Sequence, residues 1–250
     1  MMNSFIKPTL TIGLGLMLLL IVSVGHSTMV YGKTNNNGET SFEEFGEEIA
    51  FSDPLEPGNR VVGTFNDRLY FWVLKPVAIV YKTFLPTGIR QGIANAFDNI
   101  RTPIRFFNNI FQGKPEYAVQ ELERFVINSS LGIGGFFDIA ERHFGISKKD
   151  EDFGQTLAFY GVKSGPYLVW PFLGPSTVRD SFGMAVDFFL DPLNYIIPDF
   201  IIKAEVKGGE VTNYTSMHIG EYEDLKKSAL DPYIAVRDAY IQNRQKKIRE

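Results

Sequence analysis

The sequence predicts a mainly α-helical protein built as a single domain. Apolar residues recur every three to four positions in several long segments, which is the period of a helix. Only two short stretches, "YLVW" (167–170) and "EVTNY" (210–214), are candidate strands. Helix starts are marked by five pairs that end in proline: Asp53-Pro54, Thr102-Pro103, Lys114-Pro115, Asp191-Pro192 and Asp231-Pro232. Aspartate accepts hydrogen bonds from the free N–H groups of a helix start, and proline suits the first helical position.

Residues 1–32 are predicted to be a signal peptide for export. Lys7 supplies a positive charge, and Leu10–Val24 is an uncharged, mostly apolar run of 15 residues. A spanning helix needs about 20 residues, so this length suits the apolar core of a signal. Ser27 and Gly32 are candidate cleavage positions, and an uncleaved N-terminal anchor is the alternative.

Residues 33–52 are polar and then acidic, so we expect a flexible linker there. The helical domain is predicted to occupy residues 53–250. After Lys33 no run reaches 18 apolar residues, so we expect no simple membrane-crossing helix in this domain. Apolar elements of 8 to 12 residues are instead typical of helices that lie in one leaflet.

The first two helical segments, 59–80 and 99–111, carry apolar residues on more than one side. A helix that is apolar nearly all round must be buried in protein or lie in lipid. These apolar residues include Phe65, Leu69, Phe71, Trp72, Val73, Val77, Ile104, Phe106, Phe107, Ile110 and Phe111.

Three later segments read as ordinary amphipathic helices. In 116–130 the apolar residues form one stripe, and Glu121, Glu123 and Arg124 lie off it. In 176–190 Phe182, Val186, Phe189 and Leu190 are expected to face inward, and Arg179 and Asp180 to face outward as an ion pair or a headgroup contact. The segment 231–248 is a capped helix that ends in the basic run "NRQKKIR".

Composition excludes several classes of site. The 250 residues contain no cysteine, which removes disulfides and thiolate chemistry, and the three histidines are far apart. We therefore expect no metal and no cofactor. A net charge of -4 gives no reason to expect nucleic acid as a partner.

The stretch "LGIGGFF" (131–137) places Gly132, Gly134 and Gly135 directly before a phenylalanine pair. A dinucleotide fingerprint requires a strand before it and a different spacing, so nucleotide binding is disfavoured. Two alternatives remain open. The glycines form a helix C-cap followed by a turn, or they also provide a mobile tip that acts as a gate.

Catalytic motifs are weak. "DFG" (152–154) lacks the other kinase signatures. Ser176 in "GPS" lacks the G-x-S-x-G pattern of a nucleophile elbow, and no motif surrounds His143 or His218. We therefore predict that the protein is not an enzyme, with an envelope phospholipase as the remaining enzymatic alternative.

Several long motifs in a consistent order resemble the MlaA (VacJ) family of outer-membrane phospholipid transport proteins. They are "DPLEPGNRVVGTFN" (53–66), "LKPVAIVY" (74–81), "LGIGGFFDIA" (131–140), "DFGQTLAFYGVKSGPYLVWPFLGPSTVRD" (152–180) and "DPYIAVRDAYIQ" (231–242). The resemblance covers 53–190 densely and resumes at 231.

This resemblance implies a helical ring in the inner leaflet of the outer membrane, facing the periplasm, with a central amphipathic channel. Such a protein removes phospholipids misplaced in the outer leaflet and hands them to a periplasmic MlaC-like carrier, often beside a trimeric porin. A protein that only scaffolds a porin, without conducting lipid, is the alternative. The resemblance also places the glycine-rich tip on a helical hairpin beside the channel.

The residues expected to form the channel or gate are Phe65, Asn66, Asn99, Asn108, Asn128, Gly132, Gly134 and Gly135. The asparagines are candidates because they are polar residues within apolar helices. Hydrogen bonding to backbone is the alternative role for the asparagines. Well-known family members are lipoproteins with a cysteine after the signal, and this sequence has none. Attachment is therefore expected through membrane-facing side chains, with Phe71, Trp72, Phe106 and Phe107 as candidates.

Overall fold

The computed structural model describes residues 53–249, so the predicted signal peptide (1–32) and linker (33–52) lie outside the described residues. The first half of the fold comprises α2 (Glu56–Leu69), the π-helical turn η2 (Tyr70–Leu74), α3 (Lys75–Phe84), α4 (Thr87–Ile100), α5 (Thr102–Phe111), α6 (Pro115–Ser130) and α7 (Ile139–Phe144). The second half comprises α8 (Phe153–Phe159), β1 (Tyr167–Trp170), β2 (Gly174–Thr177), α9 (Val178–Leu190), α10 (Leu193–Ile196), α11 (Phe200–Met217), α12 (Glu221–Ser228) and α13 (Pro232–Arg249). The prediction of a mainly helical protein is confirmed.

Four of the five proline pairs lie at helix starts as predicted, whereas α2 begins at Glu56, after its N-cap Leu55, and not at Asp53-Pro54. Helices α5, α6 and α13 begin at Thr102, Pro115 and Pro232. Asp231 caps α13, because its Oδ1 accepts from the backbone N–H of Tyr233 at 2.9 Å. The segment 99–111 is broken at Arg101, between α4 and α5.

One of the two strand predictions is wrong. "YLVW" forms β1, which pairs with β2 in an antiparallel register from Tyr167↔Thr177 to Trp170↔Gly174. "EVTNY" instead lies within α11, whose Val211, Thr212 and Asn213 are buried. This helix packs against α3 and α4, so tertiary packing overrides the strand preference of its β-branched residues.

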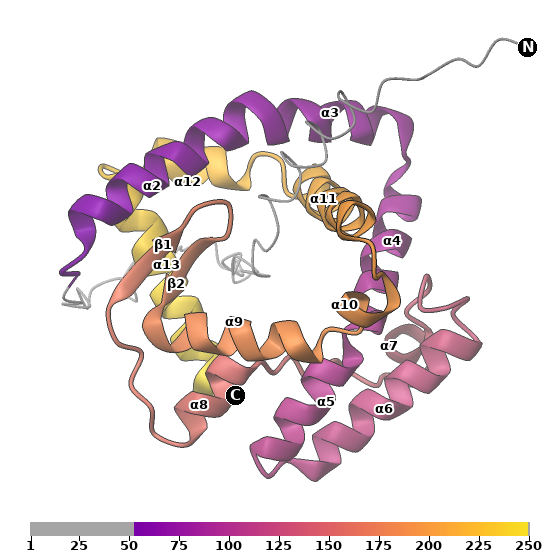
Figure 1. The fold of residues 1–250 in the computed structure, drawn as a ribbon. Coiled ribbons are helices and arrows are strands. Elements are labelled where there is room, and N and C mark those ends of the chain that lie inside the picture. Colours follow the sequence, from indigo (N-terminus) through magenta and orange to yellow (C-terminus); the bar gives the residue numbers. More distant parts are fainter. Residues whose placement is uncertain (1–52, 250) are drawn as a thin grey trace, which may run out of the picture.

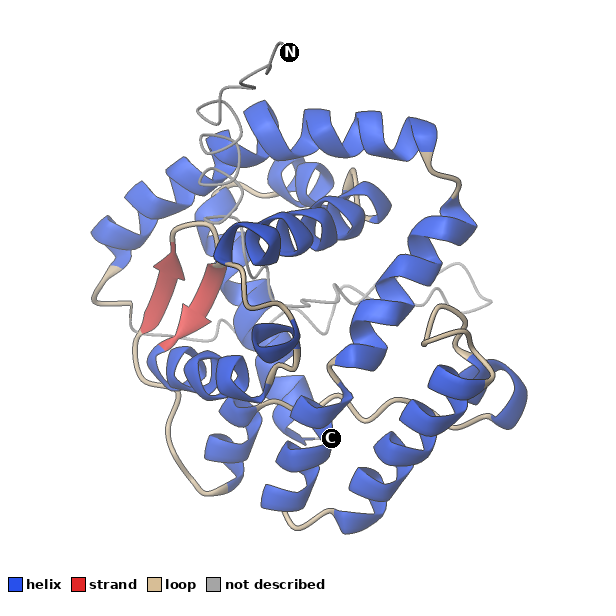
Figure 2. Ribbon diagram, turned by 45° about the vertical axis from the view of Figure 1, so that its right-hand side comes forward, coloured by secondary structure: helices blue, strands red, loops and turns tan. Residues whose placement is uncertain are grey.

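The helices follow one another around a ring (Figure 1). Helices α2, η2 and α3 form one continuous arc, α4 and α5 continue it, and α9 and α13 complete the circuit. Helix α11 lies on the inner side of α3 and α4, as a second view also shows (Figure 2). The circuit closes where α2 meets α13, because Arg60 Nη2 contacts Asp231 Oδ2 at 2.7 Å.

The interior of the described fold is unusually polar. Buried polar and charged side chains outnumber buried apolar ones, and a small apolar cluster forms around Leu74 and Val211. Large apolar side chains are instead exposed on most helices. Within residues 53–249, no helix is both long and apolar enough to cross a membrane.

Candidate functional site

Helix α6 turns its apolar stripe away from the protein. Leu122 and Val126 are 48% and 56% exposed, whereas Glu121 and Arg124 are buried. Glu121 Oε2 accepts from the Nε of Arg105 on α5 at 2.6 Å. The predicted division of α6 into an apolar stripe and a charged face is confirmed, but its direction is not the usual one, because buried ion pairs of Glu121 and Arg124 hold α6 to the ring.

Helix α9 is partly inverted in the same way, although Val186 and Leu190, which were also expected to face inward, are half-buried. Phe182 and Phe189, which were expected to face inward, are 68% and 66% exposed. Arg179 and Asp180, which were expected to face outward, are buried and joined by a 2.9 Å hydrogen bond. The reason is Arg244 of α13, whose Nη2 also donates to Asp180 at 3.0 Å and draws this end of α9 into the protein.

Exposed apolar groups continue past α9 into α10 and the start of α11. They are Phe188, Phe189, Tyr195, Ile196, Phe200, Ile201 and Ile202. Exposed apolar residues this numerous mark a surface that contacts lipid or another apolar partner.

The four residues proposed to face the membrane divide into two pairs. Trp72 and Phe107 are exposed, with Trp72 at 75%. Phe106 is half-buried. Phe71 is also half-buried, because Lys75 and Lys226 lie over its ring at 5.5 Å and 4.8 Å. Phe71 thus packs toward α12, which corrects the expectation that it faces outward.

Asn99, Asn108 and Asn128 are buried, and their amides bind protein groups. Asn108 Nδ2 donates to Asp187 Oδ1 at 3.0 Å, and Asn99 Nδ2 donates to Ser129 Oγ at 2.9 Å. Asn108 also donates to the backbone carbonyl of Ile104 at 2.9 Å, so the alternative role, hydrogen bonding to backbone, applies to it, whereas the bond of Asn99 is to a side chain. A role of these asparagines in lining a channel stays a prediction.

Asn128 joins the end of α6 to the residues that follow the glycine-rich turn. Its Oδ1 accepts from the N–H of Ala140, and its Nδ2 donates to Asp138, both at 2.9 Å. Asp138 also accepts from Arg124 Nη2 at 2.9 Å. Burial raises the pKa of Asp138, yet hydrogen bonds from Arg124 and Asn128 outweigh it and hold the pKa below its ordinary value.

The turn at 131–136 is tightly hydrogen bonded to the end of α6. The N–H groups of Gly134 and Gly135 donate to Ser129 and Asn128 at 3.1 and 2.8 Å. A Cβ at Gly135 would lie 2.4 Å from that of Asn99, so this position requires glycine. The turn prediction is confirmed, but the C-cap of α6 is Leu131, with a φ of -90°, and not a glycine. A gating role stays a prediction.

Asn66 and Phe65 meet the β1–β2 hairpin. Asn66 Nδ2 donates to the carbonyl of Trp170 at 2.9 Å, and its Oδ1 accepts from the N–H of Phe172 at 2.8 Å. The rings of Phe65 and Phe172 meet edge to face, with centroids 5.1 Å apart. Sequence reasoning selected Asn66 as a lining residue and missed its contact with the hairpin.

Asp187 is a buried carboxyl group that the sequence did not single out. Its oxygens accept from Asn108 and from the backbone N–H of Phe153, at 3.0 Å in each case. Burial and the neighbouring Asp152 raise its pKa to about 7. A signal for this residue was available, since an aspartate between Val186 and Phe188 interrupts an apolar run.

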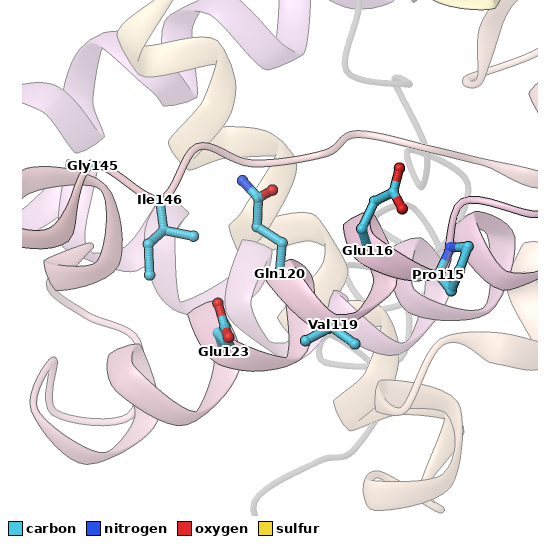
Figure 3. A pocket seen from close by; sticks show the side chains of 7 residues that line it. All are labelled: Pro115, Glu116, Val119, Gln120, Glu123, Gly145 and Ile146. Carbon is cyan, nitrogen blue, oxygen red and sulfur yellow. The ribbon is translucent and has the colours of Figure 1, made fainter.

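A surface groove with a volume of about 570 Å³ lies between α6 and the segment after α7 (Figure 3). It is lined by Pro115, Glu116, Val119, Gln120, Glu123, Gly145 and Ile146. None of the predicted channel or gate residues belongs to it. The described residues contain no cluster of three or more metal-ligating side chains.

Ser176 has no nucleophile geometry. It is 1% exposed, and its hydroxyl bonds with the carbonyl of Thr177 and the hydroxyl of Ser181. His218 stacks on Tyr214 and bonds to that residue's carbonyl. The polar groups of Ser176 and His218 are therefore bonded to neighbouring groups of the protein.

The arrangement is therefore a ring of short helices that bury charge and expose apolar surface. Residues 51–247 match the family model described as MlaA lipoprotein. The chain belongs to the MlaA family. Its 250 residues nevertheless contain no cysteine, the residue that lipoproteins acylate.

Relatives of this MlaA-family chain include the intermembrane phospholipid transport system lipoprotein MlaA of Escherichia coli (strain K12). That protein is 35% identical over 195 residues, which are 76% of each chain. The Haemophilus influenzae protein of the same name is 32% identical over 227 residues, 88% of this chain and 86% of that one. A solved structure, "Structural basis for maintenance of bacterial outer membrane lipid asymmetry", matches with a TM-score of 0.65 and 32% identity, over 79% of this chain and 100% of that chain.

Proposed function

We propose that this protein is a phospholipid-transport channel that removes misplaced phospholipids from the outer leaflet of the outer membrane. It passes them to a periplasmic MlaC-like carrier and so maintains lipid asymmetry. Two relatives are named as lipoproteins of an intermembrane phospholipid transport system, and the matching structure concerns outer-membrane lipid asymmetry. The protein moves lipid without catalysing a reaction, and residues 1–32 direct its export.

The observation that carries the proposal is the inverted polarity of the helices. A helix in water buries its apolar stripe, whereas α6 and α9 expose theirs and bury ion pairs. Short helices with exposed apolar faces suit a ring lying in one leaflet, where lipid tails cover those faces. The same exposed apolar surface also suits contact with a trimeric porin.

The test measures phospholipid on the outside of cells that lack their own family member and express this chain. We expect the chain to lower outer-leaflet phospholipid, read as restored resistance to detergent and chelator. Native mass spectrometry of the protein from membranes should show bound intact phospholipid. Unchanged surface phospholipid at normal abundance of the protein would favour a porin scaffold, and lysophospholipid from mixed vesicles would favour a hydrolase.

A further inference from the structure

Two asparagines of α2 hold the open edge of the β1–β2 hairpin. Asn59 Nδ2 donates to the carbonyl of Tyr167 at 3.0 Å, and its Oδ1 accepts from the N–H of Val169 at 2.9 Å. Two helical turns later, Asn66 makes the same pair of bonds to Trp170 and Phe172. The carboxamide of Asn59 replaces the peptide group of a missing third strand beside β1, whereas that of Asn66 joins the end of β1 to the turn that follows it.

The hairpin is fixed at its base and exposed at its tip. Tyr167, Ser176 and Thr177 at the base are at most 3% exposed. Trp170 is 42% exposed, and Pro171 in the turn is also exposed. The turn lies inside the ring beside α2 in both views (Figures 1 and 2). Any movement of this hairpin is therefore expected at its tip.

The tip holds a strained residue. Phe172 has a φ of 66°, a left-handed conformation that an aromatic side chain disfavours. Its N–H donates to Asn66, and its ring packs on Phe65 and against the cluster of Leu74 and Val211. The strain persists only while these contacts determine the conformation, and such strain is typical of switch regions.

We infer that Asn66 is a latch that positions the tip at 171–173 across the lipid path inside the ring, and that releasing it opens the path. The inference rests on the proposed function. Asn66 suits this role better than Asn59, because Asn59 is 4% exposed and has a third bond, to Asp53 at 3.1 Å. Asn66 is half-exposed, and no third bond holds it within the described residues.

The first experiment replaces Asn66 with leucine, which has a similar shape and cannot make either hydrogen bond. We expect amide hydrogen exchange of Phe172 to accelerate by about tenfold or more, because this N–H loses its acceptor and the tip can open locally. The N–H of Val169, held by Asn59, is the internal control and should keep its protection. In the same variant, transfer of a fluorescent phosphatidylethanolamine from proteoliposomes to acceptor vesicles should become faster.

The second experiment fixes the tip. Because the chain has no cysteine, Phe65→Cys with Phe172→Cys provides a unique pair for a short bifunctional maleimide. Cross-linking should lower the transfer rate relative to the same variant before cross-linking. The matched control joins Val169→Cys to Pro175→Cys, half-buried register partners within the hairpin, and should leave transfer unchanged.

A latch therefore predicts that lipid transfer becomes faster when the bonds of Asn66 are removed and slower when the tip is cross-linked to α2. A merely structural contact predicts equal or lower transfer in both cases, and either that result or unaltered exchange at Phe172 overturns the inference. If the unmodified protein transfers no lipid, the proposed function fails, while the exchange experiment still reports whether Asn66 holds the tip.

Discussion

At the residue scale, several side chains and glycines have roles that only their contacts explain. Gly134 has a φ of 67°, and its N–H donates to Ser129. Proline has neither that conformation nor an N–H. Gly134→Pro would therefore disrupt the turn itself, and it cannot separate a gate from a cap.

Gly134→Ala is the cleaner substitution, because nothing lies within 4 Å of the added Cβ. We expect a loss of about 1–2 kcal/mol in the free energy of unfolding from the left-handed conformation. A gate predicts that transport per molecule changes as well, whereas a cap predicts reduced abundance alone. Gly113→Ala is the matched control, since Gly113 has a φ of 69° and equally open space at the α5–α6 turn.

Asp187 makes stability depend on pH. Its folded pKa of about 7 lies above its ordinary 3.8, so its contribution to stability is fully present below pH 4 and is lost as pH rises to 7. At about 1.4 kcal/mol per pKa unit, the loss amounts to at most roughly 4 kcal/mol. Asp187→Asn should remove this slope when urea unfolding of the solubilised protein is measured from pH 4 to 8. Parallel pH profiles for the two proteins would contradict the assignment.

At the element scale, α6 presents an apolar face with no protein cover within the described residues. Leu122, Phe125 and Val126 are exposed, and the helix is held from behind by Glu121 and Arg124. Burial raises the pKa of Asp98 beside this cluster, but Arg105 and Lys148 outweigh burial and hold it below its ordinary value. The helix thus keeps its position without using its apolar stripe.

Replacing Leu122, Phe125 and Val126 with serine tests what covers that stripe. We expect membrane retention to weaken by about tenfold or more, since each buried side chain contributes roughly 1.5–3 kcal/mol when fully covered. Unfolding stability in detergent should change little, because the positions are exposed. The control replaces Glu116 and Glu123, exposed on the same helix, with serine. Full retention of the folded triple variant would exclude α6 from the membrane contact.

At the scale of the whole molecule, ion pairs between distant segments close the ring. Arg244 of α13 donates to Asp152 before α8 and to Asp180 of α9, both at 3.0 Å. Asp180 also accepts from Tyr240 at 2.8 Å. Burial raises the pKa of Asp180, yet Arg244 and Arg179 outweigh it and lower the pKa. One arginine therefore joins three parts of the circuit.

Arg244→Met should lower the free energy of unfolding by roughly 3 kcal/mol, because it removes one cationic partner of the buried Asp180, which keeps Arg179, and the arginine that pairs with the partly exposed Asp152. The loss should be greatest at neutral pH and smaller in acid, where Asp180 becomes protonated. Thermal unfolding of the solubilised protein measures it, and Arg249→Met on the exposed end of the same helix is the control. A change equal to that of the control would show that α13 is held by other contacts.

The sequence by itself determined the helical class, most helix starts and the family. Apolar periodicity and the proline pairs are local signals, so they locate α2–α3, α6 and α13 without knowledge of neighbours. The long motifs that resemble the MlaA family are likewise contiguous in the chain.

Only the tertiary structure decided which face of each helix is inside. Periodicity shows that α6 and α9 have two unlike faces, but in this ring much of the apolar face is exposed and the charged residues pair within the protein. The partners of those charges are distant in sequence, such as Arg244 with Asp152 and Asp180. Asn66 likewise bonds to a hairpin about a hundred residues away in the sequence. Hydrogen bonds between such distant residues produce no periodic pattern, so the sequence alone does not predict them.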